Sequence, residues 1–461
     1  MARPDHRTES ENRKRGCGVR NAYEARAAAL LLSFLVSGCG TSAIAPSAIP
    51  SPAAAPSTSG QPSNIASQAP APTPSDGASA RPTSGSVVVD ATVTRSVGLP
   101  WAFTDPRPLA VFGSRAYYLQ LLSGKDAATG KKKVPMVYRL DVADVATGST
   151  AAVVSLIPGH MIDGFAATGG SLFWVEIWYD GLPNLEDDGG NPFGGLPQHW
   201  QVVAFDVASG SRSVLASGTN HRTAIGMAGV PINPPVLAVD GDRVAYTLEA
   251  SAPGAPDGNK IMVQSLTGGS IIGTVTTKGF VPWIGLAGAV VAYREALGTN
   301  LDGRTVQDAR LMLRTLTADA GAIGVVDDHV SAAAISGDRL VWGRFDATDG
   351  SAWMTLLSDG VPVHVPGPIG VGFATGSEPG IFQVSTDAAF ASWAAVGTVN
   401  GSDQSFVPFV WQVGDRQARM LALPSTIDVI AVSDGWLSWH ESVGPPTLRS
   451  TPLGNVATFG R

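Results

Sequence analysis

The stretch DGDRVAYTLEA at residues 240–250 decides the fold, because a close copy of it, SGDRLVWGRFD, occupies residues 336–346. Each copy starts with glycine and aspartate, the residues that tolerate the backbone angles of a tight hairpin turn. An alternating apolar run with a large aromatic side chain follows the turn. A short turn next to period-two alternation is the pattern of a β-hairpin.

The same hairpin pattern occurs seven times in the chain. The other five copies are FGSRAYYLQL (112–121), TGGSLFWVEIW (168–178), LAGAVVAYREA (286–296), STDAAFASWAAV (385–396) and VSDGWLSWHES (432–442). The aligned aromatic residues are 46 to 72 residues apart, and they are Tyr118, Trp174, Tyr246, Tyr293, Trp342, Trp393 and Trp439. Repeats of this length are typical of β-propeller blades, each of which is a four-stranded antiparallel meander.

A second turn motif completes the repeating unit. FDVASG (205–210) matches DVATG (144–148), and each lies between two short alternating runs. The sequence therefore predicts an all-β, seven-bladed β-propeller over residues 86–461, with six blades as the alternative. We expect the strand SVVVDATVT (86–94) to close the ring by pairing with the last blade, because a closed ring leaves no free edge there. The repeated aromatic residues are expected to pack between neighbouring blades as core.

These phrases resemble the TolB-like propeller repeats of bacterial envelope proteins. In that family a Gly-Asp turn with a nearby arginine leads into an apolar strand ending in tryptophan, and an Asp-apolar-x-x-Gly turn follows later. The resemblance covers about 104–461 in seven units, of which those at 240 and 336 match best. It implies a propeller fold at the bacterial envelope and assigns no ligand.

The first 38 residues resemble a lipoprotein signal peptide. A basic stretch precedes an apolar run from Ala27 to Ser37, which is too short to span a bilayer as a helix. LVSGC (35–39) resembles the bacterial lipobox, which implies acylation of Cys39 and a membrane anchor. An ordinary secretory signal is the alternative. We expect an exported protein anchored to the outer face of the cell membrane, or to the outer membrane, through Cys39.

Residues 39–85 are expected to form a disordered tether. The segment is rich in Ala, Pro, Ser and Thr, as in PSAIPSPAAAPSTSG (46–60), and contains no aromatic residue. Such a segment cannot bury enough apolar area to offset the entropy lost on ordering. The domain organisation is therefore a signal peptide (1–38), a tether (39–85) and a propeller (86–461).

Charge limits the choice of partners. The net charge is −7, and residues 1–39 carry seven Arg/Lys against four Asp/Glu, so the rest of the chain has a net charge of about −10. A surface of that sign repels nucleic acid and anionic lipid. The sequence therefore favours a protein or glycan partner at the envelope, contact with the membrane only through the anchor, and a monomeric domain.

Loop length predicts which face of the disc binds. Turns between the first and second strands and between the third and fourth strands are short, whereas the remaining connections are long and share the other face. The longest loops, 179–200 and 217–235, belong to the second blade. The candidate ligand-face residues, from these loops and from 300–308, are Trp178, Tyr179, Asp180, His199, Trp200, His221, Arg222, Asp302 and Arg304.

Cofactor and catalytic signals are weak. Glu186, Asp187 and Asp188 could offer oxygen ligands to Ca²⁺, although a solvated acidic loop explains the same residues. We expect no other cofactor. Metalloprotease, nucleophile-elbow and phosphate-loop motifs are absent from the sequence. The function expected from the sequence is a lipid-anchored binding or scaffolding module for a protein or glycan. The alternative is an extracellular propeller hydrolase or lyase acting on sugars or lactones.

Overall fold

The computed structural model describes most of the chain beyond residue 93. The described ranges are 86–88, 94–99, 108–123, 135–181, 197–220, 234–249, 259–299, 306–316, 324–347, 349–358, 360–368, 373–375, 381–399, 402–423, 427–441 and 445–458. Several predictions fall outside them. These are the signal peptide, the whole of the tether with Cys39, the acidic residues Glu186, Asp187 and Asp188, and the loop residues His221, Arg222, Asp302 and Arg304.

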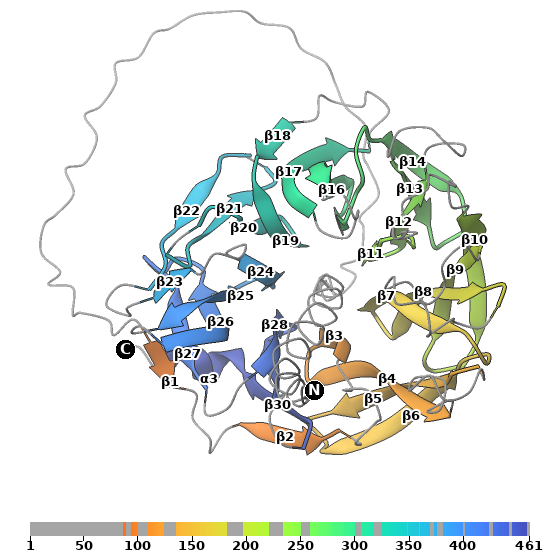
Figure 1. Ribbon diagram of the computed structural model, residues 1–461, viewed down its shortest axis with the longest axis horizontal. Coiled ribbons are helices and arrows are strands. Elements are labelled where there is room, and N and C mark those ends of the chain that lie inside the picture. The colour runs from red at the N-terminus through yellow and green to blue at the C-terminus, as the bar shows by residue number, and fades with distance from the viewer. Residues whose placement is uncertain are drawn as a thin grey trace, which may run out of the picture.

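Seven antiparallel sheets surround a common centre, so the chain is a seven-bladed β-propeller (Figure 1). Blade one contains β3 (Pro108–Phe112), β4 (Arg115–Ser123), β5 (Val137–Asp144) and β6 (Ser149–Ser155). Blade two contains β7 (Met161–Thr168), β8 (Ser171–Tyr179), β9 (Gln198–Asp206) and β10 (Arg212–Asn220). Blade three contains β11 (Leu237–Asp240), β12 (Arg243–Glu249), β13 (Asn259–Ser265) and β14 (Ile271–Thr276).

Blades four and five repeat the same meander. Blade four contains β15 (Trp283–Ala287), β16 (Val290–Thr299), β17 (Val306–Thr315) and β18 (Gly324–Asp327). Blade five contains β19 (Val330–Ser336), β20 (Arg339–Arg344), β21 (Ala352–Leu356) and β22 (Val363–Val365).

Blades six and seven recruit additional strands. Blade six contains β24 (Ile381–Thr386), β25 (Phe390–Val399), β26 (Ser402–Gln412) and β27 (Arg419–Ala422), with β23 (Phe373–Thr375) also paired to β25. Blade seven contains β28 (Ile427–Ser433), β29 (Trp436–Glu441) and β30 (Thr447–Pro452), and the short helix α3 (Leu453–Thr458) follows. Among the described residues, no helix is long and apolar enough to cross a membrane.

The ring closes through two N-terminal strands instead of the one expected over 86–94. The fourth strand of blade seven is β2 (Arg95–Gly98), which pairs antiparallel with β30. The preceding strand β1 (Ser86–Val88) pairs parallel with β27 of blade six. The strand that completes blade seven, β2, therefore begins just C-terminal to the predicted segment 86–94. In both blades an N-terminal strand therefore forms the outer edge of the sheet.

The repeated aromatic residues are inter-blade core, as the sequence predicts. All seven lie on the second strand of their blade and are at most 4 % exposed. Each shares a hydrophobic cluster with the preceding blade around the ring; for example, Trp174 packs with Tyr117 and Leu140, and Tyr118 packs with Leu448. The recurring aromatic residue therefore holds neighbouring sheets together.

The arginine of the repeated Gly-Asp-Arg phrase joins neighbouring blades. Arg339 donates to the carbonyl oxygens of Asp387 and Ala388, in the first turn of blade six, at 3.2 and 2.6 Å. Arg243 donates to the carbonyl of Gly288 in the first turn of blade four. The chain repeats the phrase because each copy builds a hairpin and, in these two blades, also binds the next hairpin. We call this side of the disc the turn face.

Candidate functional site

The opposite side of the disc carries the connections between second and third strands and between blades, and we call it the loop face. Blade two reaches this face with a row of four residues in register across its sheet. Trp178 on β8 pairs with His199 on β9, and His199 pairs with Thr219 on β10. His160 lies beside Trp178, since the next residue, Met161, pairs with Ile177. Residues in such a row have side chains on one side of the sheet.

This row produces a stack of three aromatic rings. The ring centroids of His160 and Trp178 are 4.5 Å apart with an interplanar angle of 4°. Those of Trp178 and His199 are 5.4 Å apart at 20°. Because β7 and β9 flank β8 on opposite sides, the two histidines cover opposite faces of the indole. Neither face of Trp178 is therefore open for a sugar ring to stack on.

Carboxylates fix both histidines of the stack. His160 Nδ1 lies 2.6 Å from Glu176 Oε1, and His199 Nε2 lies 2.6 Å from Asp180 Oδ1. The Glu176 side chain is fully buried and also accepts hydrogen bonds from Arg212 at 2.7 Å and from the Trp174 indole at 3.2 Å. A buried carboxylate with this many partners is held in place. The Asp180 side chain is 55 % exposed, so the outer pair is available to a partner.

The structure brings together only part of the predicted ligand face. Trp178, Asp180 and His199 form one cluster, and the Tyr179 hydroxyl accepts a hydrogen bond from Gln198 at 2.8 Å. Trp200 is 5 % exposed, and its ring fills the space next to Gly218 where a side chain would clash. Trp200 therefore packs beneath the loop face. The remaining predicted residues lie outside the described ranges.

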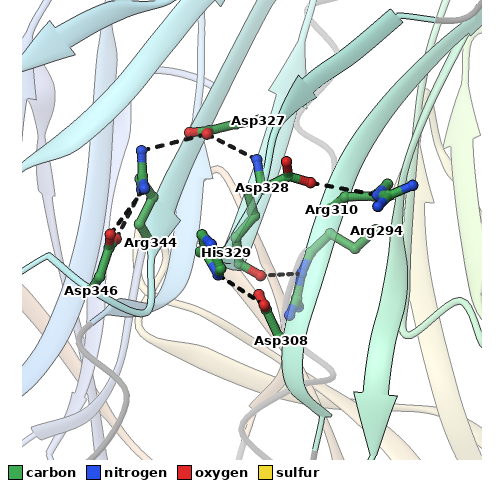
Figure 2. A network of polar contacts seen from close by, with 9 residues as sticks. Arg294, Asp308, Arg310, Asp327, Asp328, His329, Arg344 and Asp346 are labelled. Atoms are coloured by element: carbon green, nitrogen blue, oxygen red, sulfur yellow. Dashed lines mark hydrogen bonds and ion pairs between the residues drawn. The ribbon is translucent and has the colours of Figure 1, made fainter.

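A second polar cluster lies on the loop face where blades four and five meet (Figure 2). Arg344 binds Asp346 through two hydrogen bonds of 2.8 and 2.9 Å and lies 3.5 Å from Asp327. Asp327 also accepts a 2.7 Å hydrogen bond from the Trp342 indole. Asp327 therefore connects Arg344 to Trp342, which belongs to the inter-blade core.

The inner part of this cluster comes from β17 and from the connection between β18 and β19. His329 Nδ1 lies 2.8 Å from Asp308 Oδ2, and Arg310 lies 3.4 Å from Asp328. His329 has a φ angle of 61°, a conformation that residues other than glycine seldom adopt. The connection between the two blades thus places His329 against a strand of the preceding blade.

Blade seven carries a fourth histidine–carboxylate pair. His440 is fully buried, its Nδ1 lies 2.7 Å from Asp428 Oδ1, and its Nε2 has no hydrogen-bond partner. On the other side of β29, Glu441 binds Arg449 at 2.6 Å. A histidine fixed at one nitrogen by a carboxylate, with the other nitrogen unpaired, has the arrangement of a general base.

One carboxyl group near the centre of the ring has a strongly shifted pKa. Asp163 lies on β7, the innermost strand of blade two, and burial raises its pKa to about 7. No cation is paired with it among the described residues. Asp163 therefore titrates close to neutral pH.

Sequence reasoning missed most of these groups, including His160, Glu176, His329 and His440. A signal was present, because Glu176 and His440 lie within two residues after the repeated aromatic, as in WVE and SWHE. A charge inside an apolar strand requires a partner. Among the residues that the structure describes, no group of three or more His, Cys, Asp or Glu could hold a metal ion.

Comparisons with known proteins support the fold alone. No protein-family model and no curated protein matches the chain. Solved structures similar to it include the β-propeller domain of the Trilobed protease from Pyrococcus furiosus, with 9 % identity and a TM-score of 0.46 over 77 % of this chain and 93 % of that chain. An oligogalacturonate lyase in complex with manganese shows 11 % identity and a TM-score of 0.44 over 78 % and 90 %.

TolB from Acinetobacter baumannii is also among the similar structures, with 14 % identity and a TM-score of 0.35 over 67 % of this chain and 65 % of that chain. The sheet topology defines the chain as a seven-bladed β-propeller, and the likenesses to these solved structures assign it no function.

Proposed function

We propose that the protein is a binding module that docks a protein partner on the loop face of blade two. The observation that carries this proposal is the row His160–Trp178–His199, which carboxylates hold at both ends. The row is built on three strands of one sheet and needs no ligand to order it. Prearranged side chains on rigid strands reduce the entropy that binding costs.

The chemistry of the row favours a protein over a glycan. A glycan-binding tryptophan offers a free ring face, whereas both faces of Trp178 are covered. What remains for a partner is the edge of the ring, next to the partly exposed His199–Asp180 pair. Aromatic side chains are enriched where proteins bind proteins.

A pull-down from envelope extract tests the docking site. The intact protein is compared with Trp178→Ala, with a variant lacking residues 182–196, and with Asp242→Asn on the turn face as the matched control. We expect the first two variants to lose a captured protein that the control retains. Equal recovery with all four proteins would end the proposal, provided their melting temperatures agree.

We further propose that lipidated Cys39 tethers the module to the cell envelope. The support is the lipobox-like LVSGC and the Ala/Pro/Ser/Thr-rich segment that follows it. One acyl chain gives only marginal membrane binding, whereas the two or three chains of a lipoprotein hold it stably. Cys39→Ser should move the protein from the membrane fraction to the soluble fraction. Retention in the membrane fraction would show that another segment anchors it.

An enzyme acting on sugars or lactones is the second candidate. The observation in its favour is the Asp428–His440 pair, in which His440 Nε2 is unpartnered. The test measures whether the protein hydrolyses sugar lactones or cleaves oligouronides by elimination. Activity that disappears in both His440→Asn and Asp428→Asn would establish the enzyme, and a signal that survives both variants would exclude this pair.

A further inference from the structure

The seam between blades four and five contains a buried arginine without a counter-charge. Arg294, on β16, is 2 % exposed, and its Nε donates to the carbonyl of Val330 on β19 at 3.1 Å. Its Nη2 has no hydrogen-bond partner. Figure 2 shows the side chain extending toward Asp308 and His329. Burying an unpaired charge is costly, so the group needs an acceptor from elsewhere.

Other arginines of the loop face differ from Arg294. Arg139, Arg344 and Arg449 each bind a carboxylate between 2.5 and 2.8 Å. Arg294 forms no ion pair with any described residue, and burial lowers its pKa to about 9. Among the described residues, these arginines therefore have a carboxylate as counter-charge, and Arg294 has none.

Buried hydrogen-bond donors and a buried acceptor, all without partners, lie around the seam. Trp283, the cross-strand neighbour of Arg294, has an unpaired indole N–H, and the hydroxyl of Ser331, next to Val330, is unpaired as well. On the acceptor side, Asp308 Oδ1 is buried and unpaired, while Asp308 Oδ2 contacts His329. Buried polar atoms are normally satisfied, so several at one place call for a missing molecule.

The positions of Arg294 and Asp308 are linked by their partners. Arg294 contacts the carbonyl of Val330, and Asp308 contacts the ring of His329, the residue immediately before it. The two unpaired groups, one cationic donor and one anionic acceptor, therefore belong to side chains that bind consecutive residues, Val330 and His329. A molecule between them must accept a hydrogen bond at one end and donate one at the other.

We propose that this seam binds a small ligand that carries a carboxylate next to a hydrogen-bond donor, such as an α-hydroxy acid or an α-amino acid. The carboxylate accepts from Arg294 Nη2 and supplies its missing counter-charge. The adjacent hydroxyl or ammonium group donates to Asp308 Oδ1. A carboxylate without the donor would face the Asp308 carboxylate and be repelled.

Exposure along the seam sets the direction from which a ligand approaches. The His329 side chain is 54 % exposed, the Asp308 side chain is 29 % exposed, and Arg294 is buried. Accessibility thus falls from the loop face inward. The ligand enters past His329 with its carboxylate leading.

Thermal melting with simple probes tests this site. Lactate and alanine have both groups, acetate has only the carboxylate, and glycerol has only hydroxyls. At saturating millimolar probe we expect lactate or alanine to raise the melting temperature by about 1–4 °C and acetate to raise it less, with glycerol at the same concentration as the baseline. A response to lactate alone or to alanine alone identifies which donor the seam accepts.

Two variants show whether the response comes from the seam. Arg294→Met keeps an unbranched apolar stem but removes the guanidinium and should abolish the response, and Asp308→Asn should reduce it to the level of acetate. Arg344→Met, in the outer part of the same cluster, is the control and should respond like the parent protein. If Arg294→Met does not fold, Asp308→Asn and saturation-transfer NMR with lactate and alanine decide the question. No response in the parent protein, or an equal one in Asp308→Asn, would overturn the proposal.

Discussion

The two faces of the propeller differ in how several of their charged residues are bound. On the turn face, Arg243 and Arg339 bind backbone carbonyls of the neighbouring blade, and Asp387 accepts from backbone N–H groups of its own turn at 2.8 and 2.9 Å. On the loop face, side chains bind side chains, as in the pairs of His160, His199, His329 and His440 with carboxylates.

This difference separates the residues that hold the ring together from the residues that can bind a ligand or respond to pH. A side chain bonded to a backbone carbonyl is tied to the fold itself. Pairs of ionisable side chains can exchange partners with a ligand or respond to pH without changing the backbone. The turn face is therefore expected to tolerate little change, and the loop face to be where function resides.

The largest effect is expected from the inter-blade core beneath both faces. Trp342→Ala should lower the free energy of unfolding by about 3–5 kcal/mol, because the indole is fully buried between blades four and five. Trp178→Ala at the loop face should cost much less, since that ring is only partly buried. Urea denaturation measures both. Equal losses would contradict the division between core and loop face.

Asp163 should make stability depend on pH. Its folded-state pKa of about 7 exceeds the value of about 4 for an unfolded aspartate, so between these two values the folded state keeps a proton that the unfolded state has released. Stability therefore falls as the pH rises from about 4 to about 7 and is level above that. Because Asp163 keeps some contact with solvent, the loss should be smaller than the roughly 4 kcal/mol of the full shift.

Asp163→Asn checks this interpretation, since asparagine resembles the neutral acid. The fall in unfolding free energy between pH 4.5 and pH 7.5 should be smaller in the variant than in the parent protein. Identical pH profiles would assign the dependence to other groups.

A pair of arginine variants compares the two faces directly. Arg339→Ala removes two hydrogen bonds to backbone carbonyls at a buried position and should cost about 1–3 kcal/mol. Arg344→Ala removes a pair with Asp346 that is partly solvated, and should cost about 1 kcal/mol or less. Calorimetric melting distinguishes the two, and a larger loss for Arg344 would reverse the assignment of the faces.

The fold could be predicted because its signal is repeated. Each blade carries one aromatic residue at the same place on its second strand, and seven copies average out irregular blades such as the sixth. The closing strand was placed a few residues too early because a short edge strand has no repeat to compare with. Val97, its one buried residue, is a weak signal.

The site was harder to predict because its paired residues lie on different strands, far apart in the sequence. The pairing of Glu176 with Arg212 spans 36 residues, and that of Asp308 with His329 spans 21. Loop length led to Trp178, Asp180 and His199, but charged residues within the strands were treated as ordinary members of the repeat. Their partners depend on strand register, which alternation alone does not specify.

Closure by β2 has a consequence for how the molecule is made. Strand β2 begins at Arg95, and its partner β30 ends at Pro452, so the last sheet joins residues about 350 positions apart. During synthesis the earlier blades can assemble one after another, while the seventh waits for the C-terminal residues. Such distant pairing slows folding, and until it occurs the nascent protein carries an unpaired strand at each end that is open to wrong partners.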